Sequence, residues 1–343
     1  MHSFTYDALP GRVVFGPGAA RTELAAEVER LGASAVLLIA SERDAERVRA
    51  LTAPFADRIA ATFTAVREHV PVATAEAARA AAVGADAVLC LGGGSTIGAA
   101  KAVALTTRLP VLAVPTTYSG SEVTPVWGLS EDGVKTTGTD LAVLPRTVVY
   151  DPELTASLPP ELAAASALNA MAHCVEAFWA PRRNPVSSVL AEDGVRALAA
   201  GLRGNDPALL LRGAYLAGTA FAVAGSGLHH KLAHVLGGLG LPHARTHATV
   251  LPHVLAFNAA GSWEAEARIA RALGCADAVA GLRAVTAAAG IPRGLRELGL
   301  REDQLDEGAA RTERVAPADN PVPVGGGAMR RLVQAAWEGS QAE

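Results

Sequence analysis

The sequence predicts an α/β domain with a parallel sheet at residues 1–156, followed by an all-helical domain at residues 157–343. Short apolar runs alternate with helical patterns through the first of these ranges, as expected for parallel βαβ units. After Asp151 the sequence is rich in Ala and Leu, and its apolar residues recur at a helical period. Half of the 343 residues are hydrophobic, which is enough for a sizeable core.

The elements of the first domain are predicted in order along the chain. The strands are expected at residues 34–41, 60–66, 86–91 and 110–115, and the helices at residues 18–32, 74–85 and 97–106. The helix at 74–85 has Thr74 as its expected N-cap and Gly84 as its expected stop. The helices at 74–85 and 97–106 each connect two of these strands, which favours a parallel sheet.

The second domain is predicted to consist almost entirely of helices. Periodic apolar positions place them at residues 161–179, 186–202, 207–223, 226–237, 246–258, 263–273 and 277–289, with a last amphipathic helix at 327–338. Residues 303–326 are polar and contain many Pro and Gly residues, so a loop or extended segment is expected there.

Composition excludes several classes of protein. The net charge is −4 and no long basic run is present, so no nucleic-acid partner is expected. The apolar runs, such as residues 34–40 and 87–91, are too short to span a bilayer, so no membrane association is expected either. No signal-peptide pattern is visible at the N-terminus. The three cysteines lack CxxC spacing, which favours free thiols in a reducing cytoplasm.

Two polar turns follow strands of the predicted sheet. The first is a glycine turn that also opens a helix, made of Gly92, Gly93, Gly94, Ser95 and Thr96. Its backbone can approach a phosphate closely, and the helix N-terminus offers free N–H groups, although a plain tight turn would look similar. The second run, residues 115–124, holds Thr116, Thr117, Tyr118 and Ser121. Turns at the carboxyl ends of parallel strands bind nucleotides, so both are candidates for cofactor binding, although neither has a GxGxxG pattern.

Seven of the nine histidines lie between His173 and His253. His230 and His234 are four residues apart on a predicted helix, as are Asn169 and His173, so each pair lies on one face. Together with His243 they could converge on Zn²⁺ or Fe²⁺, which would act as a Lewis acid. His253 is expected to be a packing residue, and His229 and His247 are expected to line the site that the other histidines form.

Motifs along nearly the whole chain resemble those of the iron-containing (group III) alcohol dehydrogenase superfamily. These motifs include LGGGSTIGAAKA and NAMAHCVEA, and the most specific are TYSGSEVTPVWGL and GLHHKLAH, which are most similar to the maleylacetate reductase branch. The resemblance implies a fold like that of dehydroquinate synthase and iron-containing alcohol dehydrogenases. It further implies NADH or NADPH as the cofactor, an active site in the cleft between the domains, and a cytoplasmic homodimer.

The resemblance also sharpens the question of a metal. Metal-dependent members hold the ion with an aspartate and three histidines, and the matching positions here are Asn169, His173, His230 and His243. The asparagine amide is a poorer ligand than a carboxylate and removes a negative charge. We therefore expect no metal at these vestigial positions, although three histidines can still bind Zn²⁺.

The activity implied is reduction of the conjugated C=C bond of maleylacetate, a small dicarboxylate, to 3-oxoadipate in the degradation of aromatic compounds. His173, His230 and His243 are expected around the developing oxyanion, and His234 is expected next to the nicotinamide, as a proton carrier or an orienting group. The substrate candidates are Asn169, Lys231, Arg245 and Tyr118, and Lys135 and Ser41 are further candidates for cofactor contacts. Ser41 is followed by Glu42 and Arg43, which leaves the choice between NADH and NADPH open.

Three alternatives remain open on the sequence. One is a metal-dependent alcohol dehydrogenase of the same fold, and another is a reductase of a related enone or keto acid. The third is a metal-binding or regulatory protein without catalysis. Arg245 keeps the exact substrate open, because it stands where the resembling branch carries an acidic residue, in a stretch about one residue shorter than usual.

Overall fold

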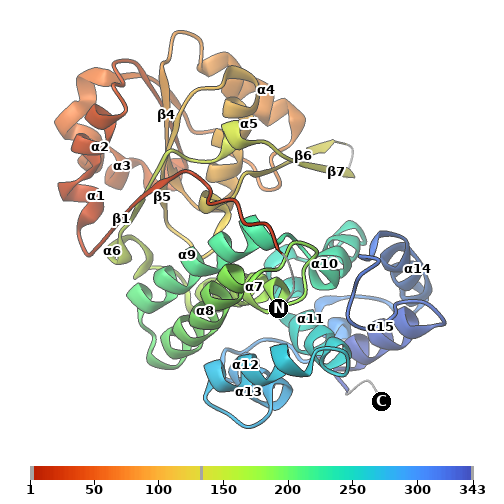
Figure 1. Cartoon of the computed structure of the whole chain (residues 1–343). Helices are drawn as coiled ribbons and strands as arrows, with labels where there is room; N and C mark the ends of the chain where they lie inside the picture. Colours follow the sequence, from red (N-terminus) through yellow and green to blue (C-terminus); the bar gives the residue numbers. More distant parts are fainter. Residues whose placement is uncertain (1–3, 132–133, 341–343) are drawn as a thin grey trace. The chain divides into compact units, whose positions relative to one another are not determined.

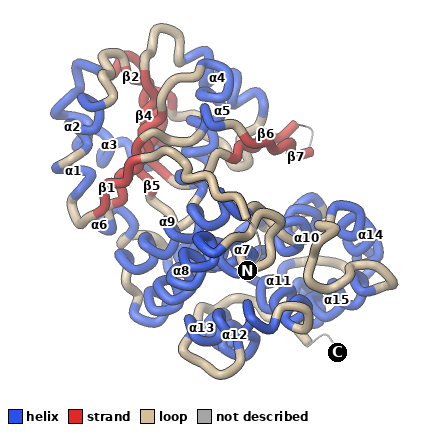
Figure 2. Tube along the Cα trace, viewed as in Figure 1, coloured by secondary structure: helices blue, strands red, loops and turns tan. Residues whose placement is uncertain are grey.

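The computed structural model describes residues 4–131 and 134–340, and of residues 134 and 135 it describes only the backbone. These residues form two compact units, one of Leu9–Leu158 and the other of the remaining described chain. The first is an α/β unit with a parallel sheet, and the second is built of helices, with no strand among its described residues (Figure 1 and Figure 2). The predicted fold class is therefore confirmed.

A six-stranded sheet forms the centre of the α/β unit. Its order is β1-β8-β5-β4-β2-β3, and all neighbouring strands are parallel. The strands are β1 (Arg12–Phe15), β2 (Val36–Ala40), β3 (Ile59–Phe63), β4 (Ala87–Gly92), β5 (Val111–Pro115) and β8 (Thr147–Tyr150). Strands β2, β4 and β5 are buried along their whole length. A strand covered on both faces needs apolar residues at every position, which explains their continuous apolar runs.

Helices cover both faces of this sheet. Those on one face are α1 (Ala19–Thr22), α2 (Leu24–Arg30) and α3 (Ala45–Thr52), and those on the other are α4 (Val72–Ala81) and α5 (Gly94–Thr107) (Figure 1). Because α3 follows β2 and α5 follows β4, the chain leaves these neighbouring strands towards opposite faces. The carboxyl ends of strands at such a switch point are where α/β sheets bind their ligands.

The α/β unit contains smaller elements that the sequence did not predict. They are β1, β8, the antiparallel hairpin β6 (Val126–Glu131) and β7 (Val134–Thr139), the short helix α6 (Pro152–Thr155), and the 3₁₀ turns η1 (Glu42–Asp44), η2 (Ala53–Arg58), η3 (Ser121–Val123) and η4 (Leu141–Val143). The predicted N-cap of α4 was wrong. The cap is Pro71 in an extended conformation, so Thr74 lies inside the first turn. Gly84 has a φ of +84°, as suits the residue that ends this helical segment.

The helical unit contains most of the predicted helices, with small differences at their ends. They are α7 (Pro160–Ala177), α8 (Pro185–Gly204), α9 (Pro207–Ala224), α10 (Leu228–Gly238), α11 (His243–Ala259), α12 (Trp263–Leu273), α13 (Ala278–Ala288), α14 (Leu305–Val315) and α15 (Ala328–Glu338), with the 3₁₀ turns η5 (Leu295–Leu298) and η6 (Glu302–Gln304). Helices α7, α8 and α9 start with proline at the first helical position, where no N–H is needed. Side chains of Asn184 and Asp206 cap α8 and α9.

Helix α14 corrects the prediction of a loop or extended segment at residues 303–326. Leu305, Ala309 and Thr312 are buried on one face of the helix, which packs against α10 and α15. The segment looked like a loop because its other face is charged and its second half is rich in Pro and Gly.

Helix α9 is long and apolar enough to cross a membrane by length and composition alone, the one such helix in the described part of the chain. Half of it is buried inside the helical unit, where it packs against α7 and α8. A core helix of a folded domain has these same properties.

Candidate active site

The glycine turn lies at the carboxyl end of β4 and forms the N-terminus of α5. No side chain caps this helix, so its first N–H groups remain available for an anion. A Cβ on Gly93 would lie 2.9 Å from the Thr117 methyl carbon, so the two turns touch here. The backbone N–H of Thr116 also donates to the carbonyl of Gly92 at 3.0 Å. The glycine turn and the second turn are therefore one structure at the edge of the sheet.

A buried lysine holds the second turn in place. Lys101 on α5 donates from Nζ to the carbonyl oxygens of Ser121, Thr124 and Val126, at 2.6, 2.8 and 2.8 Å. Burial lowers its pKa to about 7, and the nearby Glu122 opposes that shift. Glu122 is itself fully buried and accepts a hydrogen bond from the Tyr150 hydroxyl at 2.6 Å. The signal for this network was a lysine on an otherwise apolar, buried helix.

The other expected cofactor residues follow strands of the sheet at the same edge, except Lys135, which lies in the separate hairpin. Ser41 follows β2 and caps η1 by accepting from the N–H of Arg43 at 3.3 Å. Thr96 and Tyr118 are buried, and Ser121 begins η3. Lys135 lies in β7, but its side chain falls outside the described residues.

Six imidazole rings gather in the helical unit. They belong to His173 of α7, to His229, His230 and His234 of α10, and to His243 and His247 of α11. The rings of His173 and His230 stack with centroids 4.8 Å apart. His247 lies at the centre, with centroids 4.4 to 5.9 Å from those of His229, His230, His234 and His243. The four expected catalytic histidines therefore belong to one cluster, and His247, expected only to line it, lies inside it.

Glu176 fixes the orientation of His230. It lies on the same helix as His173, is fully buried, and forms a hydrogen bond with Nδ1 of His230 through Oε2. Its Oε1 accepts the backbone N–H of His229 at 2.6 Å, at the N-terminus of α10. Gly227 permits this approach, since a Cβ there would lie 2.7 Å from the same oxygen. A carboxylate bound to one ring nitrogen sets the direction and tautomer of the other, Nε2.

Several polar atoms of the cluster are buried and have no hydrogen-bond partner. They are Oδ1 of Asn169, Nδ1 of His173, Nδ1 of His229, Nε2 of His230 and both ring nitrogens of His247. Buried polar atoms normally find a partner, because leaving one unsatisfied costs about 1–3 kcal/mol. Their concentration in one place therefore marks a binding site for a polar ligand.

Burial keeps these imidazoles neutral. It lowers the pKa of His173 to about 3 and that of His229 to about 4, and it also lowers the pKa of His230 and His247 well below 6.5. Burial acts in the opposite sense on Glu176 and raises its pKa to about 7. At neutral pH these four imidazoles are therefore uncharged donors and acceptors.

These shifts predict that the chain becomes less stable in mild acid. The unfolded histidines take up protons near pH 6.5, whereas the folded ones resist, so stability is lost as the pH falls from 6.5 towards 4. Protonation of Glu176 in the folded state adds stability as the pH falls from 7 to 4.5, but this is the effect of a single group. We expect the melting temperature to fall by about 5 °C or more between pH 7 and 4.5. The His229→Gln variant should show a smaller fall, and an equal fall in both proteins would contradict this account.

The expected metal positions do not fit an iron site. Asn169, His173, His230 and His243 are neutral donors, whereas Fe(II) sites of this kind include a carboxylate. The carboxylate of Glu176 is already bonded to His230 and to backbone N–H groups. Among the described residues, His229, His230 and His247 form a group whose ligand atoms lie within 4.8 Å of one another. Three imidazoles remain a set that Zn²⁺ accepts.

The expected substrate residues differ in their surroundings. Asn169 is half-buried on the face of α7 that also carries His173, and Lys231 is half-buried and close enough to Glu176 to lower its pKa. Arg245 is exposed on α11. The sequence indicated no role for Glu176 and only a lining role for His247. Helical spacing could have indicated both, because Glu176 lies three residues after His173 and His247 lies four residues after His243.

Matches to family profiles cover most of the chain. Residues 10–152 match the family described as iron-containing alcohol dehydrogenase. Residues 163–337 match the C-terminal part of the Fe-containing alcohol dehydrogenase family. The two ranges coincide with the α/β unit and the helical unit.

Individual relatives match over nearly their full length. The maleylacetate reductase of Sphingobium indicum is 44% identical over 98% of this chain and 98% of that protein. The maleylacetate reductase of Burkholderia cepacia is 42% identical over 99% of each. A crystal structure of an iron-containing alcohol dehydrogenase from Corynebacterium glutamicum has a TM-score of 0.95 and 46% identity, covering 100% of this chain and 98% of that one. The structure of a maleylacetate reductase from a Rhizobium strain has a TM-score of 0.94 and 41% identity, covering 99% and 100%.

Proposed function

Because this chain belongs to the iron-containing alcohol dehydrogenase family, we propose that it reduces the C=C bond of maleylacetate to give 3-oxoadipate, without a metal ion. The observation that carries the proposal is the cluster of neutral, partly unpartnered imidazoles with asparagine at the position of the family's acidic ligand. The relatives named maleylacetate reductase, which are more than 40% identical over nearly the whole chain, support the choice of substrate.

The reaction adds a hydride and a proton across the double bond. A reduced nicotinamide, when bound, supplies the hydride to the alkene carbon β to the ketone and is oxidised. The substrate is reduced, and negative charge develops on the ketone oxygen as an enolate. A proton then adds to the α carbon and restores the ketone. The chain must therefore bind the substrate, stabilise an oxyanion and deliver one proton.

We assign these tasks to the histidine cluster. His173, His230 and His243 would surround the oxyanion, with His247 as a fourth ring against them. His230 has a hydrogen at Nε2 for the substrate oxygen when the Glu176 carboxyl group donates to Nδ1. Burial of Glu176 favours that protonated form. His234, which is exposed beside His243, is the proposed proton carrier.

The remaining assignments concern the two carboxylates of the substrate and the cofactor. Lys231, Asn169, Tyr118 and Arg245 are proposed to bind the substrate. The glycine turn is proposed to bind the cofactor phosphates, and Thr116, Thr117, Tyr118, Ser121, Lys135 and Ser41 are proposed to contact the rest of NADH or NADPH. We further propose a cytoplasmic homodimer, as the family resemblance implies.

Product analysis tests this function. Purified protein would be incubated with maleylacetate and either NADH or NADPH, with oxidation of the cofactor followed at 340 nm and the product identified by NMR. We expect 3-oxoadipate, in which the ketone remains and the alkene is saturated. A hydroxy acid that retains the alkene would instead indicate carbonyl reduction by an alcohol dehydrogenase. Turnover of simple alcohols but not of maleylacetate would refute the proposal.

A further inference from the structure

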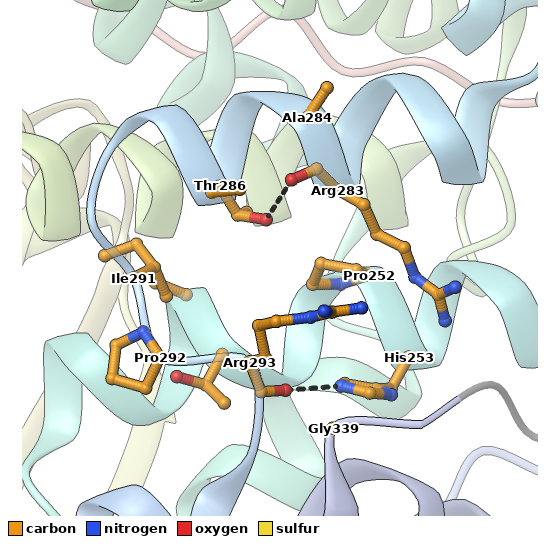
Figure 3. A pocket seen from close by; sticks show the side chains of 12 residues that line it. Pro252, His253, Arg283, Ala284, Thr286, Ile291, Pro292, Arg293 and Gly339 are labelled. Atoms are coloured by element: carbon orange, nitrogen blue, oxygen red, sulfur yellow. Dashed lines mark hydrogen bonds between the residues drawn. The ribbon is translucent and has the colours of Figure 1, made fainter.

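A pocket of about 260 Å³ lies between α11 and α13 of the helical unit (Figure 3). Its polar lining consists of Thr249 and His253 from α11, Arg283 and Thr286 from α13, and Arg293 in the segment that follows α13. None of the six clustered imidazoles lines it. It is therefore a separate site from the proposed active site.

Two arginines bring positive charge to this pocket, and Asp277 raises the pKa of Arg283 against the lowering by burial and by Arg293. Neither guanidinium group has a carboxylate oxygen within 4.0 Å among the described residues. The guanidinium group of Arg283 donates a long hydrogen bond of 3.5 Å to the carbonyl of Ser340. Two acidic residues in this part of the unit have other partners. Asp277 caps α13 by accepting from the N–H of Ala280, and Glu338 accepts from the side chain of Gln334.

Two buried polar atoms in the lining also lack a partner. Thr249 is 2% exposed and its hydroxyl oxygen has no hydrogen-bond partner, whereas the hydroxyl of Thr286 donates to the carbonyl of Arg283 (Figure 3). Nε2 of His253 lies 3.0 Å from the carbonyl of Arg293 and must donate to it. This fixes the tautomer, so the unpartnered Nδ1 of His253 is an acceptor.

We propose that this pocket binds a small oxyanion, a carboxylate or a phosphate, between the guanidinium groups of Arg283 and Arg293. Guanidinium groups present paired N–H donors that match the geometry of such anions. The free hydroxyl of Thr249 supplies a further donor at the buried end of the lining. The volume accommodates an anion of a few heavy atoms and is too small for a dinucleotide.

Titration calorimetry with the full-length protein tests the proposal. The probes are inorganic phosphate and succinate, each added at constant ionic strength, with chloride as the reference anion. We expect saturable binding of at least one probe to the unmodified protein. Arg283→Gln and Arg293→Gln should each weaken it about tenfold or more, because each removes a charge-assisted interaction. Thr249→Val should weaken it less.

The matched control is Arg296→Gln, because Arg296 is exposed in the next turn and does not line the pocket. It should bind the probes as the unmodified protein does. Binding of phosphate alone or of succinate alone would support the site and identify the class of anion. The absence of saturable binding, or an equal loss in the Arg296→Gln variant, would overturn the proposal. Melting temperatures without added anion would show that each variant is folded.

Discussion

Replacing His230 with alanine is expected to lower kcat for maleylacetate about 100- to 1,000-fold, the usual cost of losing one donor to a developing oxyanion. His230 stacks on His173, contacts His247, and is held by Glu176 through Nδ1. Removing its ring therefore removes both a donor and a support for the neighbouring rings. The measurement is steady-state NADH oxidation with maleylacetate, corrected for the fraction of folded protein.

Two further variants show whether this effect belongs to the cluster. Glu176→Gln keeps the shape of the side chain, and its amide can donate to Nδ1 as the protonated carboxyl group does, so we expect kcat and KM to stay within a few-fold of the unmodified values. His69→Asn is the control, because His69 is exposed in the α/β unit and asparagine tolerates its left-handed backbone conformation. A His230→Ala enzyme within a few-fold of the unmodified kcat would show that the oxyanion is held elsewhere.

Replacing Lys101 with methionine is expected to reduce the free energy of unfolding of the α/β unit by about 3–5 kcal/mol. Methionine fills a similar volume but donates no hydrogen bond. Three backbone carbonyl oxygens would lose their donor, and the buried carboxyl group of Glu122 would lose its nearby cation. Because these carbonyls belong to the second turn, we expect cofactor affinity to fall as well. Urea unfolding and cofactor titration would measure the two effects.

The control for Lys101 is a cation at the surface. Arg21→Met removes an ion pair with Glu153 in which both side chains are more than half exposed, and we expect little change in stability. If Lys101→Met unfolded at the same urea concentration as Arg21→Met, the buried lysine would not be what holds the second turn.

Local sequence pattern was sufficient for the elements that have a strong period or a clear boundary. The buried strands β2, β4 and β5 and the long helices of the second unit are of this kind. Strands β1 and β8 have only four residues each, so no local pattern marks them. They are neighbours in the sheet although most of the sequence of the α/β unit separates them. Helix α14 was not predicted for a different reason. Its buried face is narrow and its composition is that of a loop.

The part of the candidate site that depends on spacing within one helix was predictable from the sequence. The pairs Asn169 with His173 and His230 with His234 indicated that helices would bring these side chains together. The roles of Glu176 and His247 depend on how α7, α10 and α11 pack against one another. The sequence of one helix does not determine that packing. The same holds for the neutrality of the imidazoles, because it results from burial.

We propose that neutral imidazoles, rather than a metal ion, stabilise the oxyanion. The most direct test is the kcat for maleylacetate of protein dialysed against a strong chelator, together with the metal content of the same sample measured by mass spectrometry. We expect far less than one metal ion per chain and a kcat equal to that of untreated protein. A loss of activity on chelation that is restored by added Zn²⁺ or Fe²⁺ would contradict it.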